Sequence, residues 1–308
     1  MAQSPLNTEP GSQAPASATI ARLTPWAVRS MVVGLAYFSA GMLGLVWPGP
    51  TPLVSAFWPA MGIALAVLVR WGPTQVPALS MAVVAVHLSQ GTPLWQALMF
   101  ATGNVGGPWL AARWMSRAGF NPRLEQRRDL WLLVGGGLFG ATVVSEANGA
   151  VWLAVGGQIS ALRLPVTALH WWAGDALGVL LAGATLLALN RQSLQRAFDP
   201  LRRWITVGLV GACFALTGAA LALAAPGVWG LGSLALLLPT VLLLSALTAE
   251  VGLSVAGGTA LIMALALWVN TALGLGSFAT LVHTVDGHGQ ALLWAFCATL
   301  GLTVLLTQ

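Results

Sequence analysis

The stretch His170-Trp171-Trp172-Ala173-Gly174-Asp175-Ala176-Leu177-Gly178 decides the fold of this chain. It lies in an apolar run from Val166 to Leu189 in which Asp175 is the only charged residue. Because about 20 apolar residues in a helix cross the hydrocarbon core of a bilayer, this run predicts a membrane-spanning helix.

On that helix, Trp171 and Trp172 precede Asp175 by four and three residues and share a face with it. Gly174 and Gly178 form a pair of small residues one turn apart, which lets a neighbouring helix approach closely. A carboxylate near the middle of a membrane costs about 2.5–3.5 kcal/mol on insertion scales, so it needs a partner or a wet cavity. Two interpretations of Asp175 stay open at this point: a functional site, or a structural carboxylate that holds an adjacent helix.

The composition excludes a soluble globular domain. The chain has 308 residues, of which 57% are hydrophobic and 7% are charged. These values predict an all-α, polytopic transmembrane helical bundle that lies in the lipid bilayer. Cys213 and Cys297 lie in apolar runs without metal-ligand spacing, and no basic helix of the kind that binds nucleic acid is present.

The apolar runs predict about ten spans, with eight or nine as the alternatives. Residues 1–25 have the composition of a disordered cytoplasmic tail, and residues 26–308 form the integral-membrane domain. The segment 146–165 is interpreted as re-entrant or interfacial. The expected spans are 26–46, 53–71, a short one ending near 90, 94–115, 130–145, 166–189, 204–225, 228–248, 251–273 and 290–308.

The arginines set the orientation of this bundle. The chain has no lysine, and 12 of its 13 arginines fall on one side of the predicted spans, with only Arg163 on the other. Because short cytoplasmic loops are enriched in positive residues, both termini are predicted to be cytoplasmic. The cluster from Arg113 to Arg128 either anchors on anionic lipid or docks a partner, and lipid anchoring is the favoured interpretation.

With this orientation, polar residues gather in the outer half of the membrane. Glu146, Asn148, Trp172 and Asp175 predict a pocket that opens outward, and Asn104 is expected to lie deeper. Most of the tryptophans fit interfacial belts, but not all of them do. The tryptophans that fit a belt least well are Trp58, Trp171 and Trp172. Gly136 and Gly140 form a further pair expected to serve helix packing.

Residues for catalysis are not apparent. No GxSxG nucleophile motif is present. The glycines near Gly103 do not form a phosphate-binding loop, because they lie inside an apolar run. His283 and His288 flank Asp286, but their spacing suits a solvated turn better than a metal site. The sequence therefore predicts a protein that is not an enzyme and that has no metal and no cofactor.

Three segments together resemble the bacterial membrane-associated sensor domains of the MASE type, in the first-described group. Trp171-Trp172-Ala173-Gly174-Asp175-Ala176-Leu177-Gly178-Val179 is similar to that family's WWxGDxLGV segment. Phe57-Trp58-Pro59-Ala60-Met61-Gly62 resembles its WPxxG segment, and Thr102-Gly103-Asn104 its glycine–asparagine step. The chain departs from the family at Gly183-Ala184-Thr185, where a proline is common.

The resemblance implies a multi-pass sensory input module of the bacterial inner membrane. Such modules control a histidine kinase, a diguanylate cyclase or PAS modules through the last helix, so a cytoplasmic output domain or partner protein is expected. The chain reaches Gln308 without an output motif, which suggests either a truncated input domain or a stand-alone member. A homodimer and a membrane-protein partner are further expectations. The alternative function is a small-solute transporter or channel component that uses Asp175 and Glu146.

Overall fold

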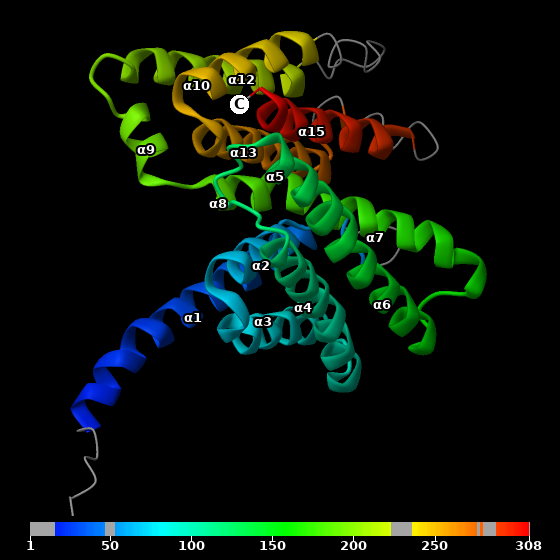
Figure 1. The fold of residues 1–308 in the computed structure, drawn as a ribbon. Helices are drawn as coiled ribbons and strands as arrows, with labels where there is room; N and C mark the ends of the chain where they lie inside the picture. Colours follow the sequence, from blue (N-terminus) through cyan, green and yellow to red (C-terminus); the bar gives the residue numbers. More distant parts are fainter. Residues whose placement is uncertain (1–15, 47–52, 223–235, 276–277, 280–287, 308) are drawn as a thin grey trace, which may run out of the picture.

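The computed structural model describes residues 16–46, 53–222, 236–275, 278–279 and 288–307, and every regular element in these ranges is helical (Figure 1). The elements in chain order are α1 (Ala16–Gly44), α2 (Pro59–Trp71), η1 (Gly72–Gln75), α3 (Val76–Ser89), α4 (Leu94–Arg117), α5 (Arg127–Leu132), η2 (Leu133–Ala141), α6 (Thr142–Val155), η3 (Ala161–Arg163), α7 (Leu164–Gly178), η4 (Val179–Gly183), α8 (Ala184–Ala188), α9 (Arg191–Ala197), α10 (Arg203–Ala222), α12 (Leu237–Val251), α13 (Leu253–Ala272) and α15 (His288–Leu306).

Six helices in the described residues are long and apolar enough to cross a membrane. Four predicted spans fall outside this set. The helices α2 and α3 have 13 and 14 residues, so each is about 20 Å long and shorter than a hydrocarbon core of about 30 Å. The other two are α4, which is long enough but less apolar, and α12, which is short. The six candidate spans are Pro25–Gly44, Arg127–Val155, Ala161–Ala188, Arg203–Ala222, Leu253–Ala272 and Gly289–Leu306.

Two predicted boundaries differ from the structure. Helix α1 begins at Ala16, so residues 16–25 of the predicted tail are helical, while residues 1–15 lie outside the described residues. The interpretation of 146–165 as re-entrant is wrong for its first half, because α5, η2 and α6 form one helix from Arg127 to Val155. Glycine is a weak helix breaker compared with proline, and this helix contains no proline.

The helix formed by α7, η4 and α8 lies at the centre of the bundle. It is buried over 78% of its apolar window, whereas the other candidate spans range from 22% to 56%. Helix α2 packs along one side of it, and α6, α13 and α15 contact it from other directions (Figure 1). The stretch that contains Asp175 therefore contacts both the first and the last parts of the chain.

Side chains fix the ends of several helices. The guanidinium of Arg70, at the end of α2, donates to the carbonyls of Leu187 and Leu189, both at 2.7 Å, and so caps the central helix. The Asn190 side chain accepts a hydrogen bond from Ser193 N at 2.8 Å and starts α9. These contacts define the end of the central helix that the arginine distribution predicts to be cytoplasmic.

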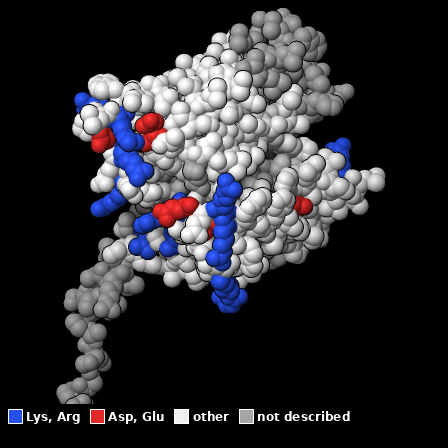
Figure 2. Space-filling view, turned by 45° about the horizontal axis from the view of Figure 1, so that its top comes forward, with Lys and Arg blue, Asp and Glu red and all other residues white. Residues whose placement is uncertain are grey.

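The surface is largely apolar. Large hydrophobic side chains face outward on several helices, among them Leu35, Met81, Val207 and Leu242, each more than half exposed. Figure 2 shows charged side chains in a few groups on an otherwise uncharged face. A surface of this composition fits contact with lipid, because a soluble protein rarely exposes apolar patches of this extent.

Candidate functional site

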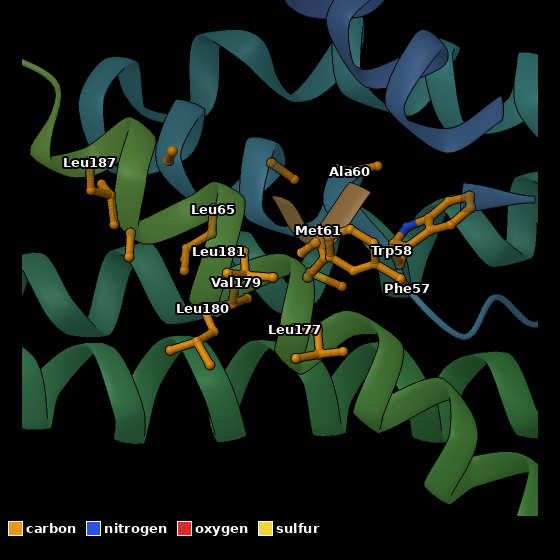
Figure 3. Packing of buried hydrophobic residues seen from close by; sticks show 14 of the residues in the cluster. Phe57, Trp58, Ala60, Met61, Leu65, Leu177, Val179, Leu180, Leu181 and Leu187 are labelled. Carbon is orange, nitrogen blue, oxygen red and sulfur yellow. The ribbon is translucent and has the colours of Figure 1, made fainter. Parts of the chain in front are cut away.

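Helix α2 crosses the central helix with the two backbones almost in contact. Trp58 N donates to the carbonyl of Gly174 at 3.0 Å. A Cβ atom on Gly178 would lie 2.8 Å from the carbonyl carbon of Trp58, and one on Gly62 would overlap the backbone of Gly178. Glycine at these positions allows the approach, which joins the WPxxG segment directly to the WWxGDxLGV segment (Figure 3).

The segment before α2 is fixed by Ser55. Its buried hydroxyl lies 2.6 Å from the carbonyl oxygen of Gly44 and 2.7 Å from that of Phe57, so its single hydrogen is shared between them, and Phe57 N donates to the same hydroxyl at 3.1 Å. The ring of Phe57 stacks on Trp268 of α13, with centroids 6.2 Å apart. The start of α2 is thereby attached to the end of α1 and to α13.

Asp175 lies at the centre of this arrangement and is fully buried. Neither of its carboxylate oxygens has a hydrogen-bond partner among the described residues. The Ser145 hydroxyl and the Trp171 indole lie close to the carboxyl, outside hydrogen-bond geometry, and half-buried Glu146 lies within electrostatic range. Glu146 is thus close enough to act on Asp175 electrostatically, and the outward-opening pocket stays a prediction.

The two tryptophans have different surroundings. Trp171 is buried against Phe100 of α4 at a centroid distance of 5.8 Å, and its ring occupies the space above Gly149 of α6. Trp172 is half-buried and stacks on Phe139 at 5.8 Å. Trp171 therefore faces the interior beside Asp175, whereas Trp172 packs toward the outside of the same bundle.

The structure places the predicted asparagines on two separate contacts. Asn104 is buried on α4, where its side-chain oxygen accepts from the Tyr37 hydroxyl at 3.4 Å and its amide donates to Phe100 O at 3.1 Å. The Tyr37 hydroxyl also lies near the indole of buried Trp58. Asn148 is half-buried and donates to Thr102 Oγ1 at 2.9 Å.

The predicted packing glycines do not all face a neighbour. A Cβ on Gly136 would meet Met115 and Trp114 of α4 at under 3 Å, so this residue lies at a helix contact. Gly140 is exposed and faces only the backbone of its own helix. Gly137 is the second packing position instead, because its Cβ would meet Leu65 and Val179.

Sequence reasoning missed the contact between the last helix and this site. Trp294 of α15 donates through its indole N–H to the carbonyl of Ala56 at 2.6 Å. The same ring packs edge-on against His170, with centroids 5.0 Å apart. Further along α15, a Cβ on Gly301 would press on Leu180 and Leu181 of η4. A lone tryptophan in an aliphatic helix gave no sign of this contact in the sequence.

The site brings oxygen-bearing side chains and aromatic rings together. Among the residues that the structure describes, no three His, Cys, Asp or Glu side chains gather in a way that could hold a metal ion. His283 and Asp286, whose spacing predicts a solvated turn, lie outside the described residues. The site offers carboxylate and hydroxyl oxygens beside aromatic rings, next to two π-helical segments, η2 and η4, of a kind frequent at functional sites.

Comparisons with known proteins agree with the resemblance of these segments. No curated protein and no solved structure matches the chain. The MASE1 family model matches residues 27–307, nearly the whole chain. The two segments whose resemblance to the family the sequence showed, at Trp58 and at Asp175, are in contact in the fold. The chain therefore belongs to MASE1, a family of membrane-associated sensory domains.

Proposed function

We propose that this chain is a sensory input module of the bacterial inner membrane, with both termini in the cytoplasm. It passes a periplasmic or intramembrane stimulus to an attached or partner output of the histidine kinase or diguanylate cyclase type. Membership of MASE1 and the six candidate membrane spans support this proposal. The arginine distribution supports the orientation, because 12 of 13 arginines lie on one side of the predicted spans.

The observation that carries the proposal is the attachment of α15 to the site. Trp294 bonds to the carbonyl of Ala56, two residues before Trp58, and packs on His170, which directly precedes Trp171. A rearrangement of either segment must move or release Trp294. In an input module the last helix leads toward the output, so this contact converts a change at the site into a change in α15.

The close crossing of α2 on the central helix is the contact proposed to switch between two packings. The glycines at positions 62, 174 and 178 leave no side chains between the backbones, so a small shift changes many contacts at once. A stimulus moves such an equilibrium only if it binds the two packings with different free energies. Trp171, Trp172, Asp175 and Glu146 are the side chains proposed to contact it.

The partners follow from the same arrangement. The apolar surface faces the bilayer, and the arginines at the proposed cytoplasmic side fit anionic lipid head groups. The output domain or protein is proposed to receive the movement of α15. A homodimer is proposed because the usual outputs act as dimers, and another membrane protein is a further proposed partner for the lipid-facing surface.

A chimera that joins this chain to a diguanylate cyclase domain tests the proposal. Asp175→Asn is expected to change basal or stimulated cyclase activity, because it alters the one buried carboxyl without a partner among the described residues. The matched control is Glu125→Gln, which changes an exposed carboxyl after α4. Unchanged activity in Asp175→Asn, at equal amounts of chimera in the membrane, would contradict the proposal.

The unpartnered Asp175 also supports a second candidate, a small-solute transporter or channel component with Asp175 and Glu146 as coupling carboxylates. Purified chain in liposomes distinguishes it from the sensor. Solute accumulation that Asp175→Asn abolishes would favour transport. Liposomes that stay empty, together with a chimera that responds to Asp175→Asn, favour sensing.

A further inference from the structure

Two buried oxygen groups face each other across the contact of α6 and α7. Asp175 and Ser145 are each 0% exposed, and neither the carboxylate oxygens nor the Ser145 Oγ has a hydrogen-bond partner among the described residues. Buried polar groups are nearly always satisfied by protein, water or a bound ion. Because the Ser145 hydroxyl and the Trp171 indole approach the carboxyl without completing a hydrogen bond, the pair leaves hydrogen-bonding capacity for a further group.

The charge around the pair is negative. Glu146, the residue after Ser145, adds a second carboxylate within electrostatic range of Asp175. The two ion pairs of the described residues are Arg123–Glu125 and Arg202–Glu250, neither of which involves Asp175 or Glu146. A buried, unpaired carboxylate is strongly unfavourable unless a cation or a proton neutralises it.

The groups that approach Asp175 limit what the neutralising species is. Carboxylate and hydroxyl oxygens are hard ligands that suit small hard cations. A multivalent metal would require more anionic ligands than these, and no group of three such side chains occurs in the described residues. A single positive charge matches one fully buried carboxylate.

The titratable groups on the neighbouring elements are Glu146 on α6, Tyr37 on α1, Cys297 on α15, Arg70 at the opposite end of α2, Arg163 on η3 and His170 on α7 itself.

We infer that Asp175, Ser145 and Glu146 form a binding site for one monovalent cation, either Na⁺ or a proton, and that occupation of this site is the stimulus. The second half of the inference rests on the proposed sensory function. An occupied site removes the uncompensated charge between α6 and α7 and favours close packing of these helices. An empty site leaves a bare carboxylate and favours their separation, which is transmitted to Trp294 through His170.

Thermal unfolding of the purified full chain in detergent tests the site without any output domain. NaCl is exchanged for N-methyl-D-glucamine chloride at constant ionic strength and pH 8. With Na⁺ as the occupant, the unfolding temperature of the wild type rises with Na⁺ concentration, by about 2 °C at tenfold excess over Kd. Asp175→Asn loses the shift, Ser145→Ala reduces it, and the carboxyl control Glu125→Gln keeps it.

The proton is distinguished by the pH dependence. With a proton as the occupant, Na⁺ has no effect, but the wild type becomes more stable as pH falls from 8 to 6, since the folded state binds the proton. Asp175→Asn, which carries a permanently neutral side chain, loses that dependence relative to Glu125→Gln. An unfolding temperature whose response to Na⁺ and to pH is the same in the wild type and Asp175→Asn overturns the cation site.

If Asp175→Asn fails to fold, Ser145→Ala and Glu146→Gln replace it, and wild-type responses in both overturn the site.

The diguanylate cyclase chimera separates the inference from the proposed function. Output that follows Na⁺ or pH through Asp175 supports both. A chimera that responds through Asp175 to neither cation overturns the stimulus but keeps the sensory function. Cation binding with an output that never depends on Asp175 overturns the sensory role of the site.

Discussion

Substitution of Gly178 by alanine measures the close crossing of α2 on the central helix. The added Cβ would overlap the carbonyl oxygen of Trp58 and lie 2.8 Å from its carbonyl carbon. Carbon atoms pack at about 3.5–4.0 Å, so the carbon contact alone requires α2 to retreat by roughly 0.7 Å, and the overlap with the oxygen requires a larger retreat. The hydrogen bond from Trp58 N to Gly174 O, now 3.0 Å long, would then stretch beyond bonding distance.

These effects combine to a measurable loss of stability. Overpacking costs about 1–3 kcal/mol, and the lost hydrogen bond costs about 1 kcal/mol. The better helix propensity of alanine returns about 1 kcal/mol. The net destabilisation is therefore about 2 kcal/mol, which lowers the unfolding temperature of a chain of this size by about 3 °C.

The assay is thermal unfolding of purified protein, followed by tryptophan fluorescence. The matched control is Gly208→Ala on α10, where an added Cβ meets nothing within 4 Å. It is expected to leave the unfolding temperature unchanged or to raise it slightly. If Gly178→Ala unfolds at the same temperature as Gly208→Ala, the backbones do not cross closely and the account of the site is wrong.

Two further substitutions test the opposite end of the bundle by the same assay. Arg70→Met removes the hydrogen bonds to the carbonyls of Leu187 and Leu189, so the protein is expected to lose about 1 kcal/mol of stability. An unfolding temperature equal to that of the wild type would show that Arg70 does not cap the central helix. Glu250→Gln weakens the ion pair with Arg202, in which the Arg202 side chain is 49% accessible and the Glu250 side chain 40%. A loss of stability below about 1 kcal/mol is therefore expected. A larger loss would mean that this pair is more buried than the structure shows.

The sequence was sufficient for the central helix. A single carboxylate in a long apolar run, followed by Arg191, predicted the span and the burial of Asp175. Membrane-helix reasoning works for such runs because each segment must satisfy its own backbone in lipid. It failed for Glu146 and Asn148, which lie within a helix that continues through Gly149 rather than at its end.

Contacts between distant segments were beyond the reach of the sequence. Periodicity shows that Gly178 is suited to close packing, but not that the neighbour is the carbonyl of Trp58. Trp294 shows the same limit, since an aromatic residue in a membrane helix usually indicates an interface. The family resemblance named the Trp58 and Asp175 segments separately, and only the fold shows that they form one site.

The most direct test of the central claim is the output of the cyclase chimera carrying Trp294→Phe. Phenylalanine keeps an aromatic ring against His170 but loses the hydrogen bond to Ala56 O. That hydrogen bond contributes about 1 kcal/mol. A free-energy change of this size alters the ratio of two conformational states about fivefold. The control is Trp204→Phe, at a largely exposed tryptophan of α10. The account predicts that basal output shifts by up to about fivefold in Trp294→Phe and stays at the wild-type level in Trp204→Phe. Equal output from both variants and the wild type would contradict it.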